Sequence, residues 1–311
     1  MRLAAACFFA IIAAAPAYAQ QGDCAKAAAP ADRVICADPK AAAADKSMAM
    51  AYEALRARLT EEQRGALLAS QRAWLARRAR ACDAKAADFA PCITRQTQER
   101  AEALAVPKGQ RPLFLGGARG LDGRLLEFEQ ADTRAKRGFN AAMAQARTHA
   151  LKEARINAAE PRFEYQADAT ISYVSPSLVS GRVAWYEYSG GAHPNHGGYG
   201  VNIDARGRPL RLDDLFDAKG LSAIEALCLA QLATQKKERL EGAFSQEDAK
   251  ALPGLLAEPL RDVKNWSFSP AGAALDFAPY VVGAYAEGDY SCAIPLRELR
   301  AAARPGAPLP Q

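Results

Sequence analysis

Hydrophobic positions at helical spacing characterise the first third of the chain. Residues 41–59 carry apolar side chains on one helical face. These are Met48, Tyr52, Leu55 and Leu59. Thr60 followed by residues 61–63, Glu-Glu-Gln, forms a capping-box pattern that begins a second helix, which should run to about Arg80. Because two helices of similar length have almost no connection, the pattern predicts an antiparallel hairpin.

Beyond residue 111, stretches rich in β-branched and aromatic residues alternate with helical ones. The predicted strands are 113–115, 162–174, 178–188, 200–203, 266–268, 275–277 and 290–294, and the predicted helices are 133–156 and 221–240. Asp213 is expected to cap the turn that precedes the second helix. Clustered strands with helices between them predict a mostly antiparallel sheet with helices on one face. The expected fold class is therefore α + (α+β), a disulfide-stapled helical hairpin followed by this sheet domain.

A glycine-rich segment at residues 188–200 separates two of these strands, and it contains two of the chain's three histidines. Glycines suit unusual backbone dihedrals and close approaches, so the segment is interpreted as a loop. Exposed loops held by a sheet often carry binding function. The candidate target-binding residues are Gly190, Gly191, His193, Pro194, Asn195, His196 and Tyr199, with Tyr186 and Tyr188 as further contacts.

The N-terminus has the features of a cleaved signal peptide. Arg2 precedes an apolar run that is shorter than the ~20 residues a spanning helix needs, and residues 17–19, Ala-Tyr-Ala, form a small-x-small cleavage site. The mature chain should begin at Gln20, in the periplasm or outside the cell. A lipoprotein signal ending at Cys7 would leave too short an apolar region.

Six cysteines remain after residue 20, an even number that predicts disulfides in an exported protein. They are Cys24, Cys36, Cys82, Cys92, Cys228 and Cys292. Cys228 should pair with Cys292 and pin a helix to the sheet. For the first four, two pairings are open: Cys36–Cys82 with Cys24–Cys92, or the local pairs Cys24–Cys36 and Cys82–Cys92.

Two prolines and a glycine interrupt the helical pattern near residue 106, which predicts a domain boundary. The expected organisation is a signal peptide at 1–19, a helical domain at 20–105, a linker at 106–110, an α+β domain at 111–303 and a tail at 304–311. A formal net charge of +5 is too small to require nucleic acid or a membrane as a partner.

The helical region carries a set of residues typical of one family. They are Cys24, the run 33–39, Asp45, Tyr52, the run 70–75, Cys82, Cys92 and the run 100–104. Their order, and the Gln-Arg-x-Trp-Leu segment at 71–75, resemble an LprI-type lysozyme-inhibitor domain. The resemblance covers about residues 22–105 and implies an exported helical module.

The second region carries motifs in a characteristic order. They are the run 187–195, Asn202 with Asp204, the run 212–216, the pattern from Phe277 through Tyr280, Gly283, Tyr285 and Gly288, and the pair Ile294-Pro295. Together they resemble an RsiV-type extracellular domain, found in an anti-sigma factor that senses lysozyme by binding it and in some peptidoglycan deacetylases. The chain shows neither a membrane span nor a deacetylase domain in its sequence, so only a binding role is expected to transfer. Tyr280, Tyr285 and Gly288 are interpreted as a structural turn.

The sequence carries no complete set of residues for a catalytic or metal site. A catalytic zinc site normally needs three protein ligands, and two of them are often histidines on one helix. Pro194 lies between His193 and His196 and excludes a helix there, so no metal and no cofactor are expected. No Gly-x-Ser-x-Gly elbow occurs. Glu164 and Glu187 on neighbouring strands could form a carboxylate pair, but solvated strand faces carry such residues routinely. The chain is therefore expected to have no enzymatic activity of its own.

Two hypotheses of function remain. The first is an envelope protein that binds, and inhibits, a lysozyme-type muramidase. The alternative is a protein that binds or modifies peptidoglycan itself, with Tyr186, Tyr188 and Tyr199 as sugar-stacking platforms.

Overall fold

The computed structural model describes residues 24–116, 120–157 and 159–311, which form two compact units. One unit contains residues 24–58 and 74–105, and the other contains residues 59–73 and 106–311. Helix α3 (Glu61–Ala81) contributes residues to both units. The predicted signal peptide at 1–19 lies outside the described residues, and the predicted linker at 106–110 remains a prediction.

The first unit is helical. Its elements are η1 (Cys24–Lys26), α1 (Pro30–Ala37), α2 (Pro39–Arg56), the last residues of α3, and α4 (Phe89–Leu104). Helix α2 covers most of the segment predicted at 41–59, but it begins earlier, at Pro39, and ends at Arg56. The Asp38 side chain caps its start by accepting a hydrogen bond from the Lys40 amide at 2.8 Å. Helix α2 packs along α4, a helix that the sequence analysis did not place.

Two disulfides cross-link this unit, each between cysteines that are close in sequence. Cys24 is bonded to Cys36, and Cys82 is bonded to Cys92. The alternative pairing across the predicted hairpin is therefore wrong. Cys82 and Cys92 pack with Ile93 into a small apolar cluster, which the disulfide stabilises where little core is available.

The same unit contains buried polar and charged side chains. Asp45 is 4% exposed, and burial raises the pKa of its carboxyl against the opposing effect of Arg78. Arg78 donates to Thr97 Oγ1 at 2.9 Å and lies 4.7 Å from the Trp74 ring, with Arg100 on that ring at 5.8 Å. The buried Trp74 ring is thus held between two guanidinium groups by cation–π contacts.

The second unit contains two sheets. The five-stranded sheet has the order β1 (Gln110–Phe114), β2 (Leu121–Phe128), β3 (Glu164–Val174), β4 (Leu178–Tyr188) and β5 (Asn195–Asp204). All neighbours are antiparallel except β2 and β3, which are parallel and are connected through α5 (Arg134–Ile156). The three-stranded antiparallel sheet contains β6 (Trp266–Ser269), β7 (Gly272–Phe277) and β8 (Tyr290–Pro295).

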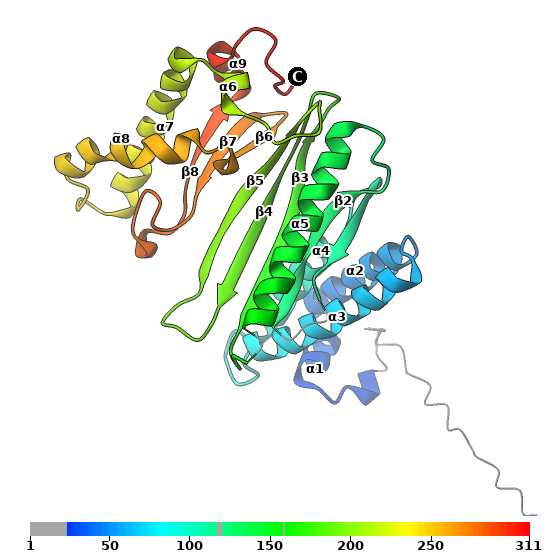
Figure 1. The fold of residues 1–311 in the computed structure, drawn as a ribbon. Coiled ribbons are helices and arrows are strands. Elements are labelled where there is room, and N and C mark those ends of the chain that lie inside the picture. Colours follow the sequence, from blue (N-terminus) through cyan, green and yellow to red (C-terminus); the bar gives the residue numbers. More distant parts are fainter. Residues whose placement is uncertain (1–23, 117–119, 158) are drawn as a thin grey trace, which may run out of the picture. The chain divides into compact units, whose positions relative to one another are not determined.

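Helix α5 covers one face of the five-stranded sheet (Figure 1). It is capped by Thr133, whose side chain accepts from the Lys136 amide, and Phe139 is fully buried against the sheet. A Cβ on Gly181 would lie 2.9 Å from the Phe139 ring, which shows that odd-numbered positions of β4 face α5. The predicted helix at 133–156 is confirmed.

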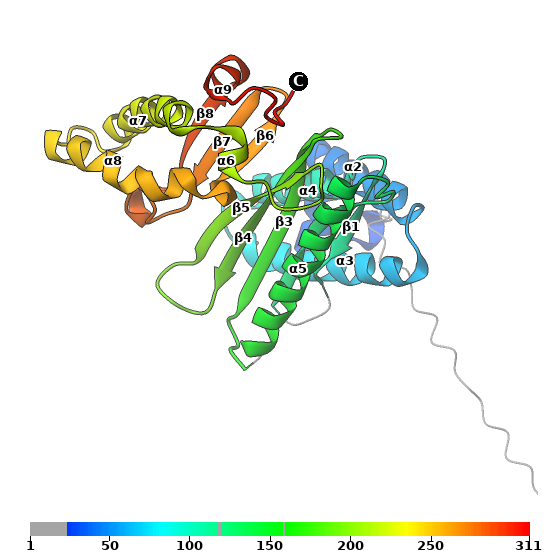
Figure 2. The same ribbon diagram turned by 45° about the horizontal axis from the view of Figure 1, so that its top comes forward.

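Strand β6 lies against the opposite face of this sheet (Figure 2). Ser180 Oγ donates to Asn202 Oδ1 at 2.7 Å and accepts from the Phe268 amide, so even-numbered positions of β4 face β6. A Cβ on Gly200 would lie 1.8 Å from the Trp266 carbonyl oxygen. Glycine at this position of β5 therefore allows the backbone of β6 to approach closely, and it does not mark a loop.

Three helices pack on the three-stranded sheet: α7 (Ala218–Arg239), α8 (Gln246–Arg261) and α9 (Leu296–Ala302). The predicted bond between Cys228 on α7 and Cys292 on β8 is present. The predicted cap was wrong: Asp213 lies inside the short helix α6 (Leu212–Leu215), and Asp217 caps α7 by accepting from the Gly220 amide at 2.8 Å. The prediction of one sheet is replaced by two sheets, each with its own helical cover.

No helix within the described ranges is long and apolar enough to cross a membrane.

Candidate functional site

The glycine-rich segment forms a shorter turn than predicted. Strand β5 begins at Asn195, so residues 189–194 make the β4–β5 turn, and His196 and Tyr199 belong to the strand. The interpretation of the whole of 188–200 as loop is therefore wrong, because the glycines of β5 serve close packing. The turn projects beyond the end of the sheet, with Gly191 and His193 exposed (Figure 1).

Aromatic side chains from a distant part of the sequence contact this turn. The Tyr285 ring stacks on the His193 ring at 3.8 Å between centroids, and the His196 ring meets Tyr285 edge-on at 5.7 Å. The Tyr285 hydroxyl donates to the Pro194 carbonyl oxygen at 2.7 Å. We call His193, His196, Tyr280 and Tyr285 the aromatic cluster. It fixes the position of the turn relative to the segment between β7 and β8.

Tyr280 is the most exposed member of the aromatic cluster. Its side chain is 66% exposed, and its ring lies 5.8 Å from that of Tyr285. Its φ of 72° lies in the left-handed region, where a bulky residue is strained. The Tyr280 amide donates to the Gly283 carbonyl at 2.8 Å, which supports this conformation. The segment with Tyr280, Tyr285 and Gly288, which was predicted as a structural turn, thus also exposes an aromatic side chain.

A buried ion pair holds the Tyr285 segment on the sheet. Glu287 Oε2 accepts from Lys236 Nζ at 2.8 Å and from the Tyr290 hydroxyl at 2.6 Å, while Oε1 accepts from the Ala284 amide. Burial alone would raise the pKa of Glu287, but these hydrogen bonds outweigh it and lower the pKa to about 2. Burial and the bond to Glu287 raise the pKa of Tyr290 to about 12.

A hollow of about 430 Å³ lies beside the aromatic cluster, between β4–β5 and β7–β8. We call it the sheet groove. The acidic and basic side chains of its lining form two pairs, Arg182 with Asp276 at 3.2 Å and His196 Nε2 with Asp289 Oδ1 at 2.8 Å. His196 therefore belongs to both the aromatic cluster and the groove.

The remaining candidate residues do not converge. Tyr186 pairs with His196 and lies on the groove face of the sheet, whereas Tyr199 pairs with Val183 and packs toward α5. Tyr188 donates from its hydroxyl to the Gly191 carbonyl at 3.2 Å, so it supports the turn. The three tyrosines therefore do not share one face of the sheet, and their role as sugar-stacking platforms stays a prediction.

Glu164 and Glu187 do not form a carboxylate pair. Glu164 is opposite Tyr188, and Glu187 is opposite Tyr165. Because direct partners share a face and neighbours alternate, the two glutamates lie on opposite faces of the sheet. They cannot act together on one substrate.

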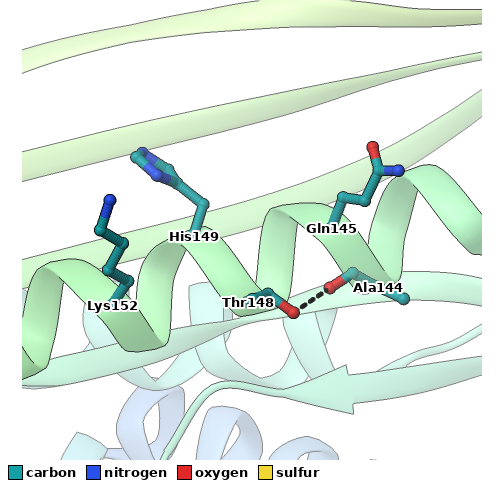
Figure 3. A pocket seen from close by; sticks show the side chains of 5 residues that line it. All are labelled: Ala144, Gln145, Thr148, His149 and Lys152. Atoms are coloured by element: carbon teal, nitrogen blue, oxygen red, sulfur yellow. Dashed lines mark hydrogen bonds between the residues drawn. The ribbon is translucent and has the colours of Figure 1, made fainter.

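Across the residues that the structure describes, no group of three or more His, Cys, Asp or Glu side chains could hold a metal ion. The third histidine, His149, lies on α5 with Gln145 and Lys152, beside a second hollow (Figure 3). All five residues that line this hollow belong to that one helix, and Thr148 is bonded to the Ala144 carbonyl at 2.9 Å. One helical wall offers a ligand little enclosure, so we assign no site there.

Comparison with family models identifies two regions. Residues 24–104 match the family described as lysozyme inhibitor LprI, and residues 213–297 match DUF3298, described as a protein of unknown function. The chain thus has an LprI domain at its N-terminus and a DUF3298 domain at its C-terminus. The description of the first family is that of a lysozyme inhibitor. With the three disulfides, this match indicates an extracellular or periplasmic protein.

Two solved structures resemble the chain. A DUF3298 family protein from Pseudomonas aeruginosa PAO1 is 20% identical, and the match covers 66% of this chain and 98% of that one, with a TM-score of 0.46. A member of the same family from Bacteroides fragilis NCTC 9343 is 17% identical, with coverage of 63% and 93% and a TM-score of 0.44. A comparison with curated proteins returns no match.

Proposed function

We propose that this chain is an exported envelope protein that binds and inhibits a lysozyme-type muramidase. The observation that carries the proposal is the LprI match over residues 24–104. The RsiV-type resemblance of the second region supports it, since that domain senses lysozyme by binding it. An inhibitor needs no catalytic residues of its own, and we expect no hydrolase activity.

The β4–β5 turn is the proposed contact with the target. A muramidase cleft contains two carboxyl groups, so a segment that occludes it should present hydrogen-bond donors. Asn195 is exposed and carries an amide donor, and the exposed His193 ring has its Nδ1 3.0 Å from the Pro194 carbonyl. The second ring nitrogen, Nε2, is then the one we propose to meet the target, to which it donates when the imidazole is protonated.

Pre-organisation of the turn supports the same role. The stack of His193 on Tyr285 and the bond from Tyr285 to Pro194 restrict the turn before any partner arrives. A restrained loop loses less conformational entropy on binding than a free one. Exposed Tyr280 beside it offers a large apolar surface of the kind enriched at interfaces.

The test is binding of the purified chain to an immobilised chicken-type lysozyme, followed by surface plasmon resonance. Replacing His193 and Asn195 with Ala should weaken binding by about 1.5–3 kcal/mol per lost charge-assisted bond, tenfold or more in Kd. Asp213→Ala, an exposed change on α6, is the matched control and should bind like the parent.

Equal Kd values for the parent and the double variant would show that the turn is not the interface. The LprI domain would then be tested for lysozyme binding. Absence of lysozyme binding by the parent would refute the proposed function itself.

A further inference from the structure

Polar side chains of helix α7 are bonded along the edge of the three-stranded sheet that β8 forms (Figure 1). Three of them are spaced four residues apart, and we call them the edge ladder: Gln231, Gln235 and Arg239. They donate to main-chain carbonyls that are spaced two residues apart, at 2.8, 2.7 and 2.6 Å. These carbonyls belong to Ala293, Ser291 and Asp289, respectively.

The spacing of the edge ladder matches the rise of the strand. Four residues of an α-helix rise about 6 Å, and two residues of a β-strand rise about 6.6 Å. Because α7 and β8 run in opposite directions, each further turn of the helix meets a carbonyl two residues earlier in the chain. An open strand edge is usually covered in native proteins. The two glutamines cover it within β8, whereas Arg239 bonds to the chain ahead of the strand.

Arg239 makes a second bond in that part of the chain. Its Nη1 donates to the Glu287 carbonyl at 2.9 Å as well as to the Asp289 carbonyl, so it holds the main chain on both sides of Gly288. Gly288 has a φ of 77°, in the left-handed region that favours glycine. Lys236, one turn earlier on α7, binds the Glu287 carboxylate at 2.8 Å. Residues 287–289 are therefore bonded to α7 through both main chain and side chain.

The same short segment carries the groups that hold the β4–β5 turn. The Asp289 carboxylate lies 2.8 Å from His196 Nε2. The Tyr285 hydroxyl donates to the Pro194 carbonyl, and the Tyr285 ring stacks on His193. An unbroken series of direct contacts thus connects the last turn of α7 with the turn proposed to meet the target. Coupling between distant sites is carried by such packed and hydrogen-bonded networks.

We propose that Arg239 is a positioning residue for the β4–β5 turn, and through it for muramidase binding. Its guanidinium fixes the main chain around Gly288, and this orients Asp289 and Tyr285 toward the two histidines of the turn. A turn that is fixed before the partner arrives binds with a smaller entropy loss. The effect on binding rests on the proposed function, whereas the position of the turn is measured without any partner.

The first test is NMR of the full chain labelled on histidine, at one fixed pH and without lysozyme. The chain has three histidines, so the imidazole signals of His193, His196 and His149 can be followed separately. Arg239→Met removes the guanidinium and keeps an apolar stem at an exposed position. It should move the His193 and His196 signals toward those of an unstacked, unbonded imidazole. The His149 signal, from α5, should stay in place and shows that the chain is folded.

Two further variants separate positioning from loss of charge. Lys237→Met removes an exposed cation from the same turn of α7 and is the matched control, which should leave all three signals unchanged. Arg239→Lys keeps the charge and a donor of similar reach, so it should restore most of the parent's signal positions. Unmoved His193 and His196 signals in Arg239→Met would overturn the proposal.

The second test is binding to immobilised chicken-type lysozyme. If Arg239→Met leaves about a tenth of the molecules with a correctly placed turn, Kd should rise about tenfold. Tyr285→Ala breaks the connection to the turn, so adding Arg239→Met to that variant should change Kd by less than about twofold. The same loss in both backgrounds would show that Arg239 acts by another route and would overturn the proposal. A parent that does not bind lysozyme would refute the proposed function, and the histidine signals would then decide the positioning role alone.

Discussion

The ion pair between Glu287 and Lys236 should contribute more to the stability of the second unit than any other single pair that we describe. Lys236 is 6% exposed, and Glu287 accepts three hydrogen bonds, from Lys236 Nζ, the Tyr290 hydroxyl and the Ala284 amide. Glu287→Gln keeps the size of the side chain and an acceptor for the amide, but leaves a buried ammonium without its counter-charge. Breaking such a pair costs about 3–5 kcal/mol, and we expect the lower end, about 3 kcal/mol.

The assay is urea unfolding followed by tryptophan fluorescence, since Trp185 and Trp266 both belong to this unit. Lys236→Met combined with Glu287→Gln should recover most of the loss, because a pair replaced by similar apolar volume is often neutral. The pKa of Glu287 is lowered from 4.5 to about 2 in the folded state. The stability it contributes is therefore present above pH 4.5 and is lost as the pH falls toward 2.

The difference between the parent and Glu287→Gln should accordingly shrink over that acidic range. A loss below about 0.5 kcal/mol at pH 7 would fall within the effect of ordinary surface substitutions. That result, or a difference that does not change with pH, would refute the assignment of this pair as buried and coupled.

Three further changes should affect stability. Replacing Cys228 and Cys292 with Ala removes a cross-link across 64 residues and should lower the free energy of unfolding by about 4 kcal/mol, measured by urea titration without reductant. Gly200→Ala should destabilise the same unit by about 3 kcal/mol, because its Cβ would lie 1.8 Å from the Trp266 carbonyl; a variant as stable as the parent would contradict this approach. Asp217→Ala should cost about 1 kcal/mol through the lost cap of α7, and an unchanged thermal midpoint would count against that cap.

Periodicity and turn residues predicted the long elements of this fold well. The strands β3 and β4 end at Val174 and Tyr188 as predicted, because β-branched and aromatic runs are bounded there by a Ser-Pro-Ser turn and by glycines. Helix α8 was missed, since Pro253 and Pro259 interrupt it. Its signal was the capping box formed by Ser245 and Asp248.

The candidate site was predicted in part. The glycine content of the segment predicted a loop that includes Gly190, Gly191 and His193, and these residues do lie in the β4–β5 turn. Their role in binding stays a prediction. The stacking of Tyr285 on His193 could not, because it joins residues that are far apart in sequence and depends on how β7 and β8 lie beside β5. The same holds for Lys236 and Glu287, whose pairing gives no local pattern.

The most direct measurement of the central claim is a titration of muramidase activity with the purified full chain. Lysis of a cell-wall suspension by chicken-type lysozyme should fall in proportion to added chain and stop near equimolar amounts. Heat-unfolded and reduced chain should have no effect, since the disulfides hold the LprI domain together. Full lysozyme activity in the presence of a tenfold excess of folded chain would contradict the proposed function.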